Sequence, residues 1–143
     1  MKPLLIVGLG NPLMGDDGVG AQIAESLAGQ VDADVLIGGT DLLRCAGEIE
    51  GRAHVILVDA AESDAQGEVT VTGEDPPEGA LEGAHTLSAP AAVRLLRRLM
   101  PEVRFTWMLV GIRSAHIGGG LSPEVAAALP RLRERLMDLA APH

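Results

Sequence analysis

Aromatic residues are almost absent: the 143-residue chain has one Phe, one Trp and no Tyr. Since 47% of the residues are hydrophobic, the core must be aliphatic, built from Leu, Val, Ile and Ala. So few aromatic rings argue against a platform on which nucleic-acid bases stack. The formal net charge of −9 argues in the same direction, because nucleic-acid binding rests on Lys and Arg contacts to phosphates. We therefore expect no nucleic-acid partner.

Cysteine and long apolar runs are also scarce. Cys45 is the one cysteine, which excludes an intramolecular disulfide and a cysteine-rich zinc site. Its place in a short helical segment favours a small buried side chain over a nucleophile. No stretch approaches the about 18 apolar residues of a transmembrane helix, and Met1–Pro3 leads into a strand-like run without the pattern of a signal peptide. We expect a soluble, cytoplasmic protein without a membrane partner.

Strand-like and helix-like patterns alternate along the chain, which is long enough for one domain, residues 1–143. Continuous apolar runs indicate strands covered on both faces, and apolar residues at helical spacing indicate helices with one buried stripe. The expected strands are 4–7, 34–37, 54–59, 68–72 and 104–111, and the expected helices start near Gly18, Asp41, Ser88 and Ser122. This order predicts a mostly parallel sheet with helices on both faces, a single three-layer α/β domain.

One strand should run against the others. The link from Asp59 to Glu68 is too short for the crossover helix that joins parallel strands. We therefore expect 68–72 to be antiparallel, at or near an edge of the sheet. The loop 73–84 that follows is rich in Gly, Pro and Glu, and its length favours a functional role.

A glycine-rich turn with two consecutive carboxylates, 8–20, follows the first strand. Such turns usually bind phosphate through backbone N–H groups and a helix N-terminus. Asp16 and Asp17 would repel a phosphate, so the loop holds a cation or binds another group. Asp16 is most simply the N-cap of the helix near Gly18. Asp17 has no such role and is the better site candidate.

Three polar residues are expected at the carboxyl ends of the parallel strands, where ligands bind in such sheets. Asp17 follows the first strand, Asp59 ends the third, and His85 lies in a loop ahead of a helix. Two carboxylates and an imidazole suit a divalent metal with open positions. Without a metal, clustered carboxylates raise at least one pKa and suit general acid–base work. His116, in a glycine loop, is a candidate substrate contact.

Other catalytic patterns are missing, and one basic surface has a simple explanation. The chain has no Gly-x-Ser-x-Gly elbow, no His-Glu-x-x-His and no P-loop lysine. Without a Ser or Cys nucleophile motif, water is favoured as the attacking group. Arg94, Arg97 and Arg98 form a basic helix face that we expect to be solvated.

An ordered set of motifs resembles the hydrogenase maturation proteases, which trim the large subunit of [NiFe] hydrogenases. The first is Gly8-x-Gly10-Asn11-Pro12-Leu13-x-Gly15-Asp16-Asp17-Gly18-Val19-Gly20. The others are Gly38-Gly39-Thr40, Val58-Asp59-Ala60, His85-x-Leu87-Ser88, Leu109-Val110-Gly111-Ile112 and Leu121-Ser122-Pro123-Glu124-Val125. They span nearly the whole chain in the family's order.

The resemblance implies a five-stranded twisted sheet and an endopeptidase of the aspartic type. It also implies that Asp17, Asp59 and His85 bind nickel and carry the reaction. The nickel is already bound by cysteines of the large-subunit precursor, which loses a short C-terminal peptide, so the protease needs no permanent metal. We further expect a monomer, with a cleft shaped by Gly10, Asn11, Asp16, Gly39, Thr40 and His116.

Two positions differ from what is most common in the family or vary within it. Family members carry Glu or Asp at the position of Asp17, and the shorter Asp places the carboxylate about one methylene further from a metal. Arg113-Ser114 follows Gly111-Ile112 where the family often has proline.

Alternatives remain open. Nickel either polarises the scissile carbonyl or a bound water, or only positions the substrate while a carboxylate acts as general base. The rival functions are a nucleotide-binding module, since Gly8-x-Gly10 follows a strand, and a non-catalytic nickel chaperone.

Overall fold

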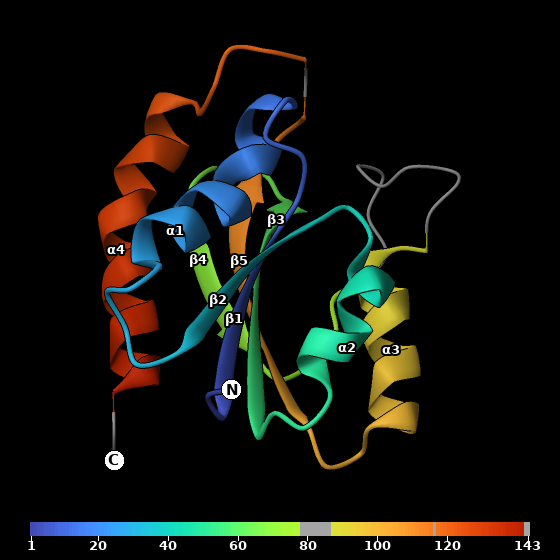
Figure 1. Ribbon diagram of the computed structural model, residues 1–143. Helices are drawn as coiled ribbons and strands as arrows, with labels where there is room; N and C mark the ends of the chain where they lie inside the picture. The colour runs from blue at the N-terminus through green and yellow to red at the C-terminus, as the bar shows by residue number, and fades with distance from the viewer. Residues whose placement is uncertain (78–86, 116, 142–143) are drawn as a thin grey trace.

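The computed structural model describes residues 1–77, 87–115 and 117–141, with strands and helices alternating through most of the chain (Figure 1). The strands are β1 (Leu4–Leu9), β2 (Asp34–Gly39), β3 (His54–Glu62), β4 (Val69–Thr72) and β5 (Arg104–Ile112). The helices are α1 (Val19–Leu27), α2 (Ala46–Ile49), α3 (Ala89–Leu99) and α4 (Pro123–Ala140), with 3₁₀ turns η1 (Gly15–Gly18) and η2 (Leu42–Cys45).

The five strands form one sheet in the order β2-β1-β3-β5-β4. Neighbours are parallel except β4, which pairs antiparallel with β5 from an edge of the sheet. The predicted fold class is therefore confirmed, including the antiparallel strand. The short link between β3 and β4 explains that direction, because it leaves no room for a crossover helix.

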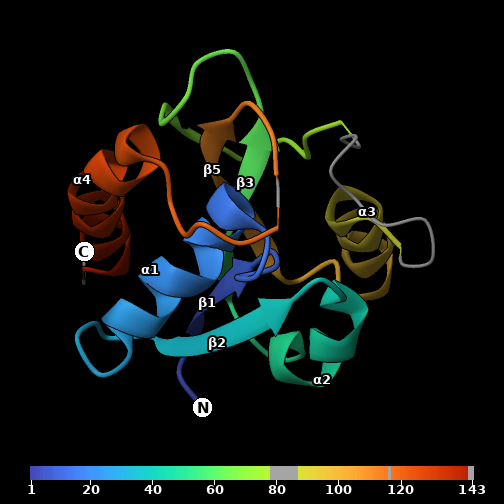
Figure 2. The ribbon, with the colours of Figure 1, turned by 90° about the horizontal axis from the view of Figure 1, so that it is seen from above.

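Two hydrophobic layers cover the sheet, one on each face. Seen from above, α1 and α4 lie on one side of the sheet and α2 and α3 on the other (Figure 2). Side chains alternate along each strand, so Val55 and Leu57 of β3 face α2 and α3, while Ile56 and Val58 face α1 and α4. Trp107 and Phe105 of β5 both lie in the α2/α3 layer. The three-layer arrangement follows from this alternation.

Glycines allow α1 to approach the sheet closely. A Cβ added to Gly8 would lie 2.7 Å from Cβ of Ala24 and overlap the Gly20 carbonyl. A Cβ on Gly20 would overlap the carbonyl oxygens of Leu9 and Val58. The N-terminal turn of α1 thus lies directly over β1 and β3.

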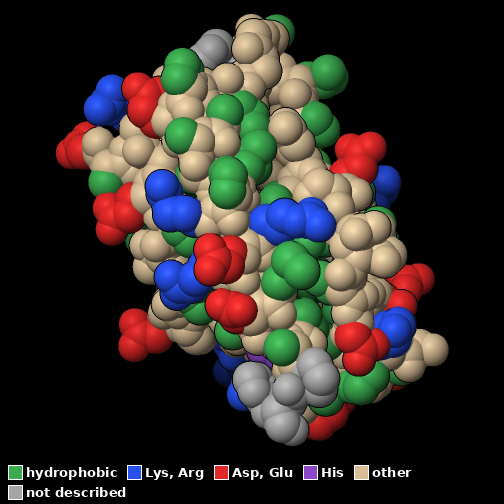
Figure 3. Space-filling model, turned by 90° about the vertical axis from the view of Figure 1, so that its left-hand side faces the viewer, with side chains coloured by type: hydrophobic (Ala, Val, Ile, Leu, Met, Phe, Trp, Pro, Cys, Tyr) green, Lys and Arg blue, Asp and Glu red, His purple; other side chains and the backbone are tan. Residues whose placement is uncertain are grey.

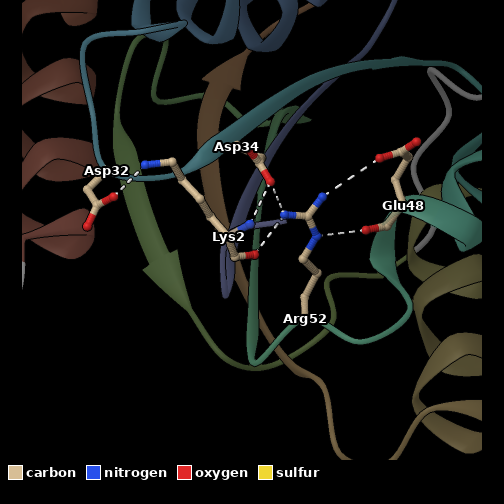
Figure 4. Close-up of polar contacts among 5 residues, drawn as sticks. All are labelled: Lys2, Asp32, Asp34, Glu48 and Arg52. Carbon is tan, nitrogen blue, oxygen red and sulfur yellow. Dashed lines mark hydrogen bonds and ion pairs between the residues drawn. The ribbon is translucent and has the colours of Figure 1, made fainter.

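Buried Arg52 joins three segments at the amino ends of the parallel strands (Figure 4). Its guanidinium donates to the Glu48 carbonyl at 2.8 Å and the Lys2 carbonyl at 2.7 Å, and it is paired with the Asp34 carboxylate. The bond from Arg52, with a second from the Lys2 backbone N–H, lowers the pKa of Asp34. These contacts lie at the opposite end of the strands from their carboxyl ends, where the ligand site is expected.

On the outer side of α1 and α4, acidic and basic side chains are intermixed (Figure 3). A shallow groove on this side, between the two helices, is lined by Gln22, Ile23, Ser26, Leu129, Pro130 and Arg133. Within the described part of the chain, no helix is both long and apolar enough to cross a membrane.

Candidate functional site

The order in which the chain adds strands to the sheet reverses between β1 and β3. The crevice above these two strands is therefore the expected ligand site. From β1 the chain crosses through α1 to β2 on one side, whereas β3 leads to β4 and β5 on the other. In parallel sheets, ligands bind at such a switch point, outside the carboxyl ends of the strands. The signature loop, residues 10–18, leaves β1 at this place, and its turn η1 contacts β3.

Asp17 lies in η1 and is half-buried. Its Oδ2 accepts a hydrogen bond from the backbone N–H of Asn11 at 2.9 Å. Burial raises the pKa of Asp17, and the Asn11 N–H opposes part of that shift. The carboxylate is thus held by the loop in which it lies.

The predicted cleft-shaping residues of the first two strands lie around this loop. Asn11 Oδ1 accepts from the N–H of Leu13 at 2.9 Å, and the Gly10 N–H donates to the Gly39 carbonyl at 2.9 Å. Gly10 has φ +107°, and a Cβ there would overlap the Asp17 carbonyl. Thr40 is an exposed residue in the turn after β2. The end of β2 is therefore tied to the loop that carries Asp17.

Asp59 lies within β3 rather than at its end. β5 continues alongside β3 and pairs Asp59 with Leu109, so the strand runs on to Glu62 after β1 has ended at Leu9. By strand alternation, Asp59 follows Leu57 on the α2/α3 side. Its Oδ1 accepts from the N–H of Ala60 at 2.8 Å. Although our prediction of its place in the strand was wrong, Asp59 still lies at the switch point.

The expectation that Asp16 caps a helix is also wrong. Neither η1 nor α1 has a side-chain cap, and the Asp16 side chain is buried, with the residue only 3% exposed. Its carboxylate accepts hydrogen bonds from Gln66 and from the N–H of Ser122. Partners from distant loops thus satisfy the carboxylate, a pairing that local sequence could not indicate.

Gln66 and Ser122 are the residues of this edge whose contacts sequence reasoning missed. Gln66 lies between β3 and β4, in no recognisable pattern. Ser122 was expected only to open the last helix; it does so, since its side chain accepts from the N–H of Val125. A partly buried amide that bonds both an acidic and a hydroxyl side chain has no signature in one sequence.

His85 and His116 lie outside the described residues, so the structure does not test the predicted set of Asp17, Asp59 and His85. Within 1–77, 87–115 and 117–141, no three His, Cys, Asp or Glu side chains are grouped as they would be around a metal ion. The two carboxylates that are described have the oxygen donors that a divalent ion accepts. Cys45 is 6% exposed and belongs to the α2/α3 core, as predicted.

Solved structures of hydrogenase maturation proteases share the fold of this chain. The chain resembles HybD, a [NiFe] hydrogenase maturation protease from Thermococcus kodakarensis, with 30% identity, a TM-score of 0.77, and 99% of this chain and 100% of that one covered. It also resembles the hydrogenase maturating endopeptidase HybD from E. coli, with 25% identity and a TM-score of 0.77. That match covers 97% of this chain and 91% of the E. coli chain. The maturation protease HycI from T. kodakarensis shares the fold at 22% identity and a TM-score of 0.79, with 96% and 91% covered.

The family assignment follows from the sequence as well. The profile described as hydrogenase maturation protease, HycI, matches residues 19–139, which include Asp59 and begin two residues after Asp17. The chain belongs to the hydrogenase maturation protease family. A comparison with curated proteins found no match.

Proposed function

We propose that this chain is an endopeptidase that removes the C-terminal extension of a nickel-loaded [NiFe] hydrogenase large-subunit precursor. The observation that carries the proposal is the position of Asp17 and Asp59, on β1's loop and on β3, at the switch point of a maturation-protease fold. His85 completes the proposed set. The nickel arrives as part of the substrate.

Asp17 and Asp59 have two chemical uses. In the first, they and His85 bind the precursor's nickel, so that the ion polarises the scissile carbonyl or activates a water. In the second, nickel only positions the precursor, and one carboxylate takes a proton from the attacking water. The second use suits Asp17, because burial raises its pKa toward the range of a general base. In the second use the enzyme is an aspartic-type endopeptidase.

Exposed apolar side chains near the signature loop suit a protein substrate. Leu13 is 74% exposed and Ile117 is 86% exposed. The N–H of Gly118 donates to the Leu13 carbonyl at 2.9 Å, which joins the segment before α4 to the signature loop. Large exposed apolar side chains held beside a site favour contact with another protein. We propose that Leu13 and Ile117 contact the precursor.

Incubation of the purified chain with nickel-loaded precursor tests the function. Asp17→Asn and Asp59→Asn should each lower the cleavage rate by at least about 100-fold, because a general base or a charged ligand is lost. Asp64→Asn removes an equal charge from an exposed position in the β3–β4 loop and should stay within about twofold of the wild type. Circular dichroism verifies that each variant is folded.

Other outcomes would select a rival function. Binding of the precursor without cleavage would indicate a nickel-site chaperone. Thermal stabilisation by NAD or ATP, with no response to nickel-loaded precursor, would indicate a nucleotide-binding module. His85→Ala should abolish the preference for nickel-loaded over nickel-free precursor. The cytoplasmic location and monomeric state remain predictions, to be tested by fractionation and sedimentation.

A further inference from the structure

A hydrogen-bonded network centred on Gln66 connects three loops at the carboxyl edge of the sheet. The Gln66 Nε2 group donates to Asp16 Oδ2 at 2.7 Å and to Ser122 Oγ at 2.9 Å. Its Oε1 accepts from the backbone N–H of Arg113 at 2.6 Å. The side-chain amide therefore uses both its donors and its acceptor to link the signature loop, the β3–β4 loop and the β5–α4 segment.

Asp16 completes the network from the signature loop. Its Oδ1 accepts from the backbone N–H of Ser122 at 2.6 Å, while Oδ2 accepts from Gln66. Ser122 is also the N-cap of α4. Both oxygens of a carboxylate in η1 are thus bonded to groups at the start of α4 and in the β3–β4 loop.

The geometry of η1 connects this network to Asp17. A 3₁₀ turn has about three residues per turn, so consecutive side chains point about 120° apart. Asp16 points into the network, and Asp17 points to the Asn11 N–H. Two bonds on the Asp16 carboxylate restrict rotation of the turn about its own axis. They therefore restrict the direction of the Asp17 carboxylate.

We propose that Asp16 and Gln66 are positioning residues that fix the Asp17 carboxylate at the switch point. The proposal rests on the function proposed above, because the readout of that position in catalysis is precursor cleavage. Asp16 itself binds no nickel and transfers no proton. Its carboxylate is committed to Ser122 and Gln66.

Exchanging donor and acceptor groups gives a sharp test. In Asp16→Asn, an amide donor faces the Gln66 Nε2 donor; in Gln66→Glu, a second carboxylate faces Asp16. Each single variant breaks the pairing. The double variant Asp16→Asn/Gln66→Glu restores it, because the new amide donates to the new carboxylate, which still accepts from the Arg113 N–H. The double variant also has the wild-type net charge.

Two readouts follow the Asp17 position. In the free protein, hydrogen exchange of the Asn11 amide reports its bond to Asp17 and should be faster in both single variants. With precursor, the single variants should lower kcat about 10- to 100-fold with little change in KM, as expected when a reacting group is misplaced. The double variant should recover most of the wild-type protection of the Asn11 amide and most of the wild-type kcat. Arg52→Met, destabilised at the far edge of the sheet, should leave kcat near the wild-type value.

Several results would overturn the proposal: unchanged Asn11 exchange in the single variants, no recovery in the double variant, or an equal loss of kcat in Arg52→Met. If the wild type itself does not cleave the precursor, the proposed function fails. Hydrogen exchange of the Asn11 backbone amide in the wild type, the two single variants and the double variant then decides separately whether Asp16 and Gln66 hold Asp17.

Discussion

Trp107 donates its indole N–H to Oδ1 of Asp75 over 2.9 Å, which bonds the one tryptophan of the chain to the segment that follows β4. Asp75 also accepts from Arg97 of α3, with the nearest pair of atoms 3.0 Å apart. The Arg97 guanidinium in turn lies 5.3 Å from the ring centre of Phe105. One carboxylate thus connects β5, α3 and the start of the long loop.

Asp75→Ala should destabilise the protein by about 1–3 kcal/mol, since it leaves a fully buried indole N–H without its acceptor. Urea unfolding followed by Trp107 fluorescence measures this directly, and the native emission should also shift. Glu74→Ala removes the same charge from an exposed neighbour and should stay within about 0.5 kcal/mol of the wild type. Equal effects of the two variants would contradict the role given to Asp75.

Gly10→Ala should damage both stability and cleavage. The residue has φ +107°, and a Cβ would overlap the Asp17 carbonyl. Left-handed backbone at a non-glycine residue costs about 1–3 kcal/mol, and relief of the overlap would move Asp17. Thermal denaturation and precursor cleavage measure the two effects.

Gly47→Ala is the matched control for Gly10→Ala. Gly47 lies in α2 with open space where a Cβ would be, so alanine there should raise stability by about 0.5–1 kcal/mol. Cleavage by this variant should be unchanged. If Gly10→Ala were as active and as stable as Gly47→Ala, Gly10 would have no part in holding Asp17.

The order of strands and helices could be predicted because its signals are local. Apolar runs and helical spacing lie within each segment, and the short link after Asp59 gives the direction of β4. The ends of strands were less predictable. β3 extends to Glu62 because β5, about 50 residues away, pairs with it. No feature of residues 59–62 alone indicates that partner.

Single polar side chains were the hardest to place, since their partners are distant in sequence. Asp16 resembles a helix cap locally, but its partners are Gln66 and Ser122, 50 and 106 residues away. Arg97 was predicted to be solvated and instead pairs with Asp75 and lies over Phe105. The turn that carries Asp17 was predictable, because the glycines around it are a local signal.

Arg52→Met should cost about 1–3 kcal/mol, because the carbonyls of Lys2 and Glu48 lose their donor. The guanidinium is buried, with 3% of the side chain exposed. Arg44→Met provides the comparison, since its side chain is 85% exposed and lies 3.4 Å from Asp41. An exposed pair of this kind contributes little, so this variant should stay within about 0.5 kcal/mol. Denaturation in urea at neutral pH measures both, and a larger loss in Arg44→Met would refute the assignment.

His54 should make stability depend on pH. Burial, and then the positive charge of Arg104, lower the pKa of His54 to about 4. The neutral ring fits its contacts, with Nε2 2.8 Å from Thr106 Oγ1 and Nδ1 3.1 Å from the Arg104 guanidinium that donates to it. In the unfolded chain the pKa returns to about 6.5. Between these values the unfolded chain binds a proton that the native protein excludes, so the free energy of unfolding falls as pH falls from about 6.5 to about 4.

His54→Gln should remove this part of the pH dependence. Urea unfolding at intervals from pH 7.5 to 4 gives the difference in free energy of unfolding between wild type and variant, in which all other titrating groups nearly cancel. We expect a constant difference above pH 7 and a shift in favour of the variant as pH falls through 6.5 toward 4. Arg104→Gln should raise the lower end of the pH range over which stability changes, because loss of the positive charge raises the pKa of His54. A difference that stays flat from pH 7 to 4 would show that His54 is protonated as readily in the native protein as in the unfolded chain.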